Sequence, residues 1–219
     1  MSNNATPKRR YDATRRREQA AQTRVAIVAA AAKVFVERGY AKATIGAIAA
    51  AAGVAVETVY RSAAGKAGLL NAAVQAALAG GVERSDVPVE RRPGIRALIE
   101  EPDPRRKLAL YAATQPGVHG RSAPLMAVLA EAAGSDPELI DLLASYDEQR
   151  LTGMRRFAAH LAETGALRPG LTVERAADII WTLQAPDVYT ALVAKRGWLP
   201  EEYRDWLAET LASALLPPA

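Results

Sequence analysis

Residues 43–62 read ATIGAIAAAAGVAVETVYRS, and this stretch decides the class of fold. Thr44 is suited to cap a helix, the apolar residues after it have helical spacing, and Gly53 supplies a stop. After a turn, a second short helix is predicted over Val56–Ser62, with Val59 on its inner face. Two short helices joined by a glycine turn are typical of a helix-turn-helix, which places its second helix in the major groove of DNA. A plain helical bundle can contain the same corner, so spacing alone leaves both interpretations open.

The chain on either side also has the apolar spacing of helices. One predicted helix begins at Thr14 and ends at Gly39, and another runs from about Lys66 to Gly80. The charged segment 83–93 contains two prolines and predicts a domain boundary near residue 85. No stretch alternates as a strand would. We therefore predict an all-α fold with a flexible basic arm (1–13), an N-terminal three-helix helix-turn-helix DNA-binding domain (14–85) and a helical effector-binding and dimerisation domain (94–219).

The back domain is predicted to contain a series of separate helices. One helix begins at Pro104, and another is capped by Ser122 after a loop that carries His119. The sequence SDPE at 135–138 fits a capping box that opens the next helix. Pro186 is expected to interrupt a helix over 172–196, and a last helix begins at Pro200.

Composition excludes several classes of protein. The 219 residues include 48 alanines and no cysteine, which rules out a disulfide scaffold, a zinc–thiolate site and a cysteine nucleophile. No apolar run reaches the roughly 18 to 20 residues of a membrane span. Basic residues before 25–32 imitate a secretory signal, but Lys33 interrupts the apolar run and the helical period continues. We expect a cytoplasmic protein.

Charge is distributed unevenly along the chain. Residues 1–66 contain 12 Lys/Arg and 4 Asp/Glu, a net of +8, whereas residues 67–219 have a net charge of −4. A basic module on a mildly acidic body is the pattern of a protein that meets a polyanion with one end, and nucleic acid is the leading candidate. The basic runs at 8–10 and 15–17, taken alone, fit a solvated tail equally well.

A family resemblance rests on the residues in and around this stretch. Arg38-Gly39-Tyr40, the run 43–54, Thr58-Val59-Tyr60-Arg61, and Lys66 before Leu69-Leu70 together resemble the DNA-binding domain of the tetracycline-repressor (TetR) family of bacterial transcription regulators. The resemblance covers roughly residues 17–78, and the remainder matches the family only in plan. It implies a dimeric protein with a helical ligand-binding domain.

Carried over position by position, the resemblance implies roles for individual residues. Thr44 would cap its helix and bind a phosphate, and Tyr60 and Lys66 would contact the DNA backbone. Phosphate contacts of this kind set the register, while base edges are read by the residues between them. The groove-facing residues would be Val56, Glu57, Thr58, Arg61 and Ser62.

The sequence also departs from the family pattern. Ala55 replaces the usual serine or threonine cap, Ala63 replaces an aromatic residue, and Gly65 loosens the start of the next helix. Glu57 would repel phosphate, although a carboxylate can accept a hydrogen bond from the cytosine amino group, and both interpretations stay open. These departures put the selectivity of DNA binding in doubt more than the fold.

The family resemblance places an effector pocket among the back helices. Pro186 supports this, because a helix break frees carbonyl groups and opens space. His119 and His160 have no carboxylate at metal-ligand spacing, so no metal site, cofactor or catalytic residue is predicted; His160 fits a structural role. Each pocket candidate can equally be a core residue. The candidates are Tyr111, His119, Met126, Tyr146, Trp181, Gln184 and Asp187.

Taken together, the sequence predicts a homodimeric repressor that a small apolar or aromatic effector releases from its DNA operator. The dimer is predicted from the last two helices, whose apolar residues lie on more than one side. The alternatives are an architectural or weakly specific DNA-binding protein and, more remotely, an all-helical enzyme that uses Glu131 and Glu148, for which no Glu-x-x-His pattern exists.

Overall fold

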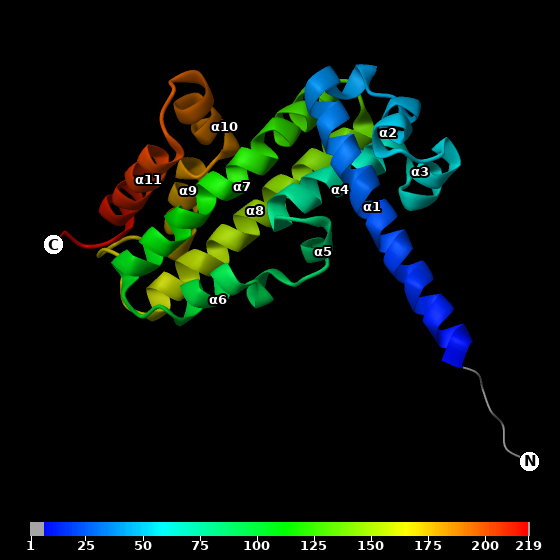
Figure 1. Cartoon of the computed structure of the whole chain (residues 1–219). Helices are drawn as coiled ribbons and strands as arrows, with labels where there is room; N and C mark the ends of the chain where they lie inside the picture. Colours follow the sequence, from blue (N-terminus) through cyan, green and yellow to red (C-terminus); the bar gives the residue numbers. More distant parts are fainter. Residues whose placement is uncertain (1–6, 219) are drawn as a thin grey trace, which may run out of the picture.

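The computed structural model describes residues 7–218, and these residues contain helices and no strand, as the sequence predicts. Residues 1–6 of the predicted basic arm lie outside the described residues. Figure 1 shows a head at one end of the molecule, from which the first part of α1 projects, and a bundle that extends away from it. The head contains α1 (Pro7–Lys42), α2 (Ile45–Ala52), α3 (Val56–Ser62) and α4 (Gly65–Ala79).

The rest of the chain forms the bundle and its connections. Short α5 (Val82–Ser85), the 3₁₀ helix η1 (Val89–Arg91) and α6 (Pro93–Glu100) lead into the long helices α7 (Pro104–Ala133) and α8 (Pro137–Glu163). The remaining elements are α9 (Val173–Leu183), α10 (Pro186–Tyr189), the π-helix η2 (Thr190–Lys195) and α11 (Pro200–Leu215). None of the described helices has an apolar stretch that could cross a membrane.

Two hydrophobic cores hold the molecule together. The first joins the head to the C-terminal half of α7 and the start of α8, through residues such as Phe35, Leu70 and Leu129. The second contains α6, the N-terminal half of α7, the end of α8, α9 and α11, with Leu108 and Ile180 fully buried. Each fully buried side chain of this size contributes about 1.5–3 kcal/mol. Because α7 and α8 run through both cores, the head and the bundle share their packing.

Helix α1 differs from the prediction at its start and agrees with it at its end. It begins at Pro7, seven residues before the expected cap at Thr14. Gly39 has φ +71°, which breaks the helix before a last turn that ends at Lys42. Glycine enters this left-handed region at little cost, so the predicted stop is confirmed.

Helix α7 is continuous, and the prediction of two helices separated by a loop is wrong. Pro116 and Pro124 both lie inside it, and Ser122 donates to the carbonyl of Val118 at 2.9 Å instead of capping a new helix. Proline usually interrupts a helix because it removes a hydrogen bond. Here the helix packs on neighbours in both cores along its length, and that burial outweighs two local defects.

The start of α8 is shifted by one residue from the predicted capping box. Asp136 is the N-cap and accepts from the backbone N–H of Glu138 at 3.1 Å, while Ser135 donates to the carbonyl of Ala132. Pro137 is the first helical residue, where proline is favoured, so the preceding aspartate becomes the cap.

The break at Pro186 is confirmed. Thr172 caps α9 as predicted, by accepting from the backbone N–H of Arg175 at 3.3 Å. The helix ends at Leu183, Ala185 is extended with ψ 142°, and α10 restarts at Pro186. The residue before a proline avoids the helical region, which explains the extended link.

Candidate DNA-binding surface and effector site

The helix-turn-helix has the geometry that the sequence predicts. The Thr44 hydroxyl oxygen accepts from the backbone N–H of Ala47 at 3.1 Å and so caps α2. Gly53 has φ +66°, and its N–H bonds back to the carbonyls of Ala49 and Ala50. Since the Thr44 side chain uses its oxygen as acceptor, its O–H remains available to donate to a phosphate.

Helix α3 turns one face into the head and the other to solvent. Val59 is 1% exposed and belongs to the first core, whereas Tyr60 is 61% exposed. Figure 1 shows α3 at the outer side of the head, away from α9–α11. Exposure therefore leaves this helix accessible to a partner. Its other exposed side chains are Val56, Glu57 and Arg61, and its half-buried ones are Thr58 and Ser62.

Two polar side chains of α3 bond within their own helix. Ser62 donates to the carbonyl of Val59 at 2.8 Å, and Arg61 Nη2 lies 3.4 Å from the Thr58 hydroxyl. A serine that donates to its own helix retains an acceptor but has no free proton for a phosphate. Arg61, Thr58 and Glu57 therefore remain able to bind bases from this face, and Ser62 can still accept a hydrogen bond.

Lys66 is less free than a solvated lysine. Its Nζ lies 3.4 Å from the carbonyl of Ala41 and 4.3 Å from the centre of the Tyr40 ring. Partial burial lowers the pKa of Lys66, and the carboxylate of Asp136, the N-cap of α8, opposes this effect. The ammonium thus ties the start of α4 to the end of α1, and a lysine's remaining N–H groups can reach a phosphate.

The three departures from the family pattern have structural counterparts. Ala55 and Ala64 precede α3 and α4, and neither supplies a side-chain cap. Gly65 has φ +75° and begins α4, while Ala63 packs partly buried against the first core. The recognition helix is therefore held by its packing and not by its ends.

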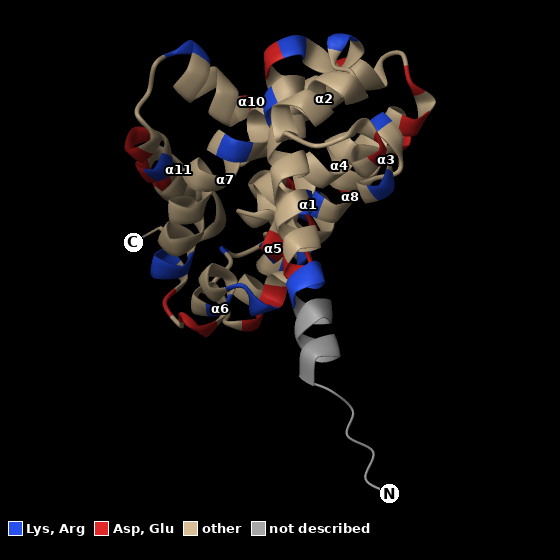
Figure 2. Cartoon of the chain, turned by 45° about the vertical axis from the view of Figure 1, so that its right-hand side comes forward, with Lys and Arg blue, Asp and Glu red and all other residues tan. Residues whose placement is uncertain are grey.

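Basic residues also extend beyond the head. Arg15, Arg16 and Arg17 are exposed on the part of α1 that projects from the molecule in Figure 1 and Figure 2. This helical extension places positive charge where a polyanion can approach it.

In the bundle, five predicted effector residues lie near one another. His119 is 3% exposed on α7, and its ring centre lies 5.4 Å from Tyr189 and 6.3 Å from Tyr203. Gln184, at the end of α9, is also 3% exposed, and its backbone lies close to His119. Burial, together with Arg150, lowers the pKa of His119 to about 4.

Arg150 connects the remaining members of this cluster. Its Nη1 donates to the carbonyl of Trp181 at 2.6 Å, and its guanidinium lies 4.0 Å from the centre of the Trp181 ring. Burial lowers the pKa of Arg150, and Asp147, whose Oδ1 lies 3.6 Å from Arg150 Nη2, opposes this together with Tyr111 and Asp187.

The sequence places Tyr189 near the break at Pro186, but sequence reasoning missed Arg150 and Tyr203 as members of this cluster. The signal for Arg150 was present, because it occupies the apolar stripe of α8 between Tyr146 and Met154, where a charge is unexpected. Nothing in the sequence distinguished Tyr203 from other core residues.

Met126 and Tyr146 are not brought to this cluster. Both belong to the first core, where the Tyr146 hydroxyl donates to Asn71 Oδ1 on α4 at 2.6 Å. His160 lies elsewhere in the bundle, with Nε2 2.8 Å from Lys107 Nζ and 3.1 Å from the carbonyl of Ile99, consistent with a structural role.

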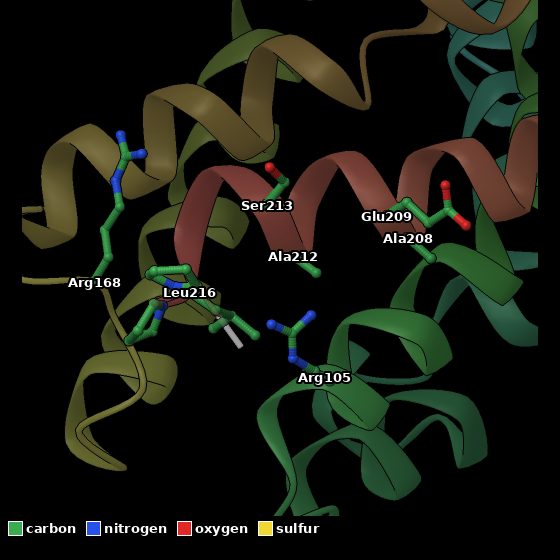
Figure 3. A pocket seen from close by; sticks show the side chains of 9 residues that line it. Arg105, Arg168, Ala208, Glu209, Ala212, Ser213 and Leu216 are labelled. Atoms are coloured by element: carbon green, nitrogen blue, oxygen red, sulfur yellow. The ribbon is translucent and has the colours of Figure 1, made fainter.

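Two surface hollows lie on the bundle. One, of about 550 Å³, separates the start of α7 from the end of α11, and Figure 3 shows Arg105 pointing into it. The other, of about 630 Å³, follows α9 and α11 and includes Ile179, Leu183 and Thr210. Neither contains a predicted effector residue.

Residues 27–73 match the model of a family described as bacterial regulatory proteins, tetR family. The N-terminal domain belongs to the TetR family. This TetR domain covers α2, α3, most of α4 and the buried part of α1. No curated protein sequence shows significant similarity to the chain.

Solved structures with a similar fold extend the likeness to nearly the whole chain. The transcriptional regulator FadR of Bacillus subtilis, in complex with stearoyl-CoA, is 22% identical, with a TM-score of 0.68 over 86% of this chain and 97% of FadR. NalD of Pseudomonas aeruginosa, the secondary repressor of the MexAB-OprM multidrug efflux pump, is 23% identical, with a TM-score of 0.68 over 92% of this chain and all of NalD. The SmeT–triclosan complex is 20% identical, with a TM-score of 0.64 over 90% and 93% of the two chains. At these identities the likeness establishes the TetR fold of the bundle as well as of the head.

Proposed function

We propose that the chain is a cytoplasmic, homodimeric transcriptional repressor that leaves its operator when an effector binds in the second core. The observation that carries this proposal is α3, whose one buried residue Val59 leaves Tyr60, Arg61 and Glu57 exposed at the outer edge of a TetR-family domain. A helix exposed in this way fits the major groove, with Thr44, Tyr60 and Lys66 on the backbone.

The effector part of the proposal rests on the cluster around His119 and on the relatives. FadR is described with stearoyl-CoA and SmeT with triclosan, both of which have large apolar parts. In this chain, the cluster lies beside the break between α9 and α10, where a ligand can be accommodated with least disruption of regular helix.

The head and the effector cluster are connected by α7. Arg121, two residues after His119, donates from Nε to the carbonyl of Ala77 at 3.0 Å, near the C-terminus of α4. A cation there also interacts favourably with the helix dipole. A shift of α7 caused by a ligand at His119 is therefore passed to α4, and through it to α3.

We assign the dimer interface to α9 and α11, where less apolar surface is left exposed for a partner than the sequence predicts. Most of the α11 stripe is buried in its own chain, and it comprises Tyr203, Leu207, Leu211, Leu215 and Leu216. Ile179, Leu183 and Trp206 are only partly buried, and the first two line the hollow along α9 and α11. A second copy packed on this face by two-fold symmetry would complete a four-helix bundle.

DNA binding at several salt concentrations tests the proposal. The purified chain is titrated with DNA taken from beside its gene and with random DNA of equal length. We expect specific DNA to bind at least a thousandfold more tightly at physiological salt. Equal affinity with a steep salt dependence for both DNAs would support an architectural protein instead.

A further inference from the structure

The second core contains buried polar atoms that have no hydrogen-bond partner among the described residues. They include Trp181 Nε1, Gln184 Nε2 and the Tyr203 hydroxyl. His119 and Gln184 are 3% exposed, and Tyr203 is 0% exposed. Since buried polar groups in proteins are almost always hydrogen-bonded, a cluster of such atoms calls for a partner from outside the chain.

These atoms belong to one site. The rings of His119, Tyr189 and Tyr203 are mutual neighbours, with the two tyrosine centres 5.0 Å apart. The Gln184 backbone lies close to His119, and Trp181 is one helical turn earlier on α9. Arg150, stacked on Trp181, is near enough to His119 to lower its pKa. The site is therefore enclosed by α7, α8, α9 and α11.

The unpaired atoms are mainly donors. Indole and amide N–H groups cannot accept, so Trp181 Nε1 and Gln184 Nε2 require an acceptor. The Tyr203 hydroxyl can also donate. With Arg150 beside them, this side of the site offers several donors and a cation.

The walls of the site are aromatic. Tyr111 packs on Phe157 with ring centres 4.9 Å apart, and it lies near enough to Tyr203 for the two phenols to interact electrostatically. Tyr189 meets the Tyr203 ring edge to face. Such walls suit a flat apolar body.

We propose that the effector is an aromatic compound bearing a carbonyl or carboxylate oxygen, which accepts hydrogen bonds from Trp181, Gln184 and Tyr203. This rests on the proposed function and narrows it, because a purely apolar effector would leave these donors unpaired. Gln184 directly precedes the extended Ala185, so a ligand bonded to it acts on the break between α9 and α10.

Matched probes test the acceptor without DNA. 2-Acetylnaphthalene and 2-ethylnaphthalene have nearly the same shape, and only the first has an acceptor; 2-naphthoate adds a charge. Binding to the full chain is measured by tryptophan fluorescence. We expect the ketone to bind at least tenfold more tightly than the hydrocarbon, as one or two hydrogen bonds provide. Comparison of 2-naphthoate with the ketone shows whether the site prefers an anionic or a neutral acceptor oxygen. Equal binding of the ketone and the hydrocarbon overturns the proposal.

Two variants assign the effect to the named groups. Tyr203→Phe and Gln184→Leu should each reduce the preference for the ketone severalfold, and Tyr146→Phe, which removes a phenol from the first core, should not. The variants also report on the free protein. Removing an unpaired hydroxyl should leave the melting temperature of Tyr203→Phe equal to or above that of the wild type.

The melting temperatures test separately whether the donors are unpaired in the free protein, and failure of both the ketone and the naphthoate to bind overturns the proposal. If Tyr203→Phe and Gln184→Leu both melt well below the wild type, their polar groups are paired with internal water, and the proposal is wrong. If both melt at or above the wild type, the donors are unpaired in the free protein, as proposed. Failure of DNA binding would count against the repressor function alone, because these measurements contain no DNA.

Discussion

Tyr60 and Lys66 differ in whether they also stabilise the head. Tyr60 is 61% exposed on α3, whereas Lys66 is partly buried against Tyr40 and Ala41. Both are proposed to contact phosphates, but only Lys66 also connects α4 to α1. Substitution of Lys66 therefore affects the head itself, and Tyr60 is the cleaner probe of DNA contact.

The first prediction concerns these phosphate contacts. Tyr60→Ala, alone or with Lys66→Ala, should weaken binding to specific and random DNA by the same factor, because phosphate contacts position the protein without reading sequence. Arg61→Ala should instead reduce the difference between the two DNAs. Fluorescence anisotropy at moderate salt measures both. Unchanged affinity in the double variant would contradict the assignment of the helix-turn-helix.

A second prediction uses the lowered pKa of His119. In the unfolded chain a histidine titrates near 6.5, but burial lowers the folded pKa to about 4. Between these values the unfolded state binds more protons, so stability falls as pH decreases from about 6.5 to 4, by on the order of 3 kcal/mol in full. Urea unfolding at several pH values should show this loss.

The other histidine provides the control for that titration. His119→Gln should flatten the pH dependence, and His160→Gln should leave most of it in place. An identical slope in the wild type and His119→Gln would show that other groups cause the acid sensitivity.

A helix can be stabilised by a side-chain cap at its end or by packing along its length, and the helices of this chain differ in which of the two they use. Helix α2 has a side-chain cap at Thr44, while α3 has none and relies on Val59 in the first core. Helix α7 depends most on packing, because its burial in two cores keeps it helical across two prolines.

The third prediction restores the missing cap of α3. Ala55 is extended, with φ −69° and ψ 150°, which are the angles of an N-cap residue. Ala55→Ser should raise the free energy of unfolding by about 1 kcal/mol. Thermal unfolding measures this gain, and Ala50→Ser, on the exposed face of α2, is the control. A loss of stability in Ala55→Ser would mean that the end of α3 differs from the structure described.

The fourth prediction concerns the connection between α7 and α4. Arg121→Met keeps an unbranched apolar side chain but removes the guanidinium and its bond to the Ala77 carbonyl. Ligand binding in the second core should persist, while its effect on DNA affinity becomes severalfold smaller. Parallel ligand and DNA titrations measure the two quantities. Full coupling in the variant would exclude this route.

Over the whole molecule, α7 and α8 run through both cores, and α9, on which the dimer face is proposed, lies at the opposite end from α3. A repressor with two heads needs a separation of about 34–36 Å between them, so the proposed dimer and the proposed link through α7 would together control DNA binding.

The fifth prediction tests the dimer. Ile179→Glu with Leu183→Glu places charge on the α9 face that is proposed to meet the partner and should give monomers. Sedimentation at micromolar concentration should show a dimer for the wild type and a chain of 23.3 kDa for the variant. The variant should also lose specific DNA binding. A wild-type monomer would end the two-headed mechanism.

Local signals in the sequence determined the all-α class, the bounds of α2 and α3, the glycine stops and the break at Pro186. Caps, helical spacing and proline act over four or five residues, so the sequence contains their cause directly. Such signals also fail, because they predicted that Ser122 caps a new helix, whereas Ser122 lies inside the continuous helix α7.

Packing between distant segments decided the rest. It made α7 continuous, buried the α11 stripe that the sequence assigned to a partner, and placed Tyr146 beside Asn71 instead of Trp181. It also brought Arg150 and Tyr203 to the His119 cluster. Burial depends on which surfaces meet in three dimensions, and an apolar stripe is the same in sequence whether it faces its own core or another chain.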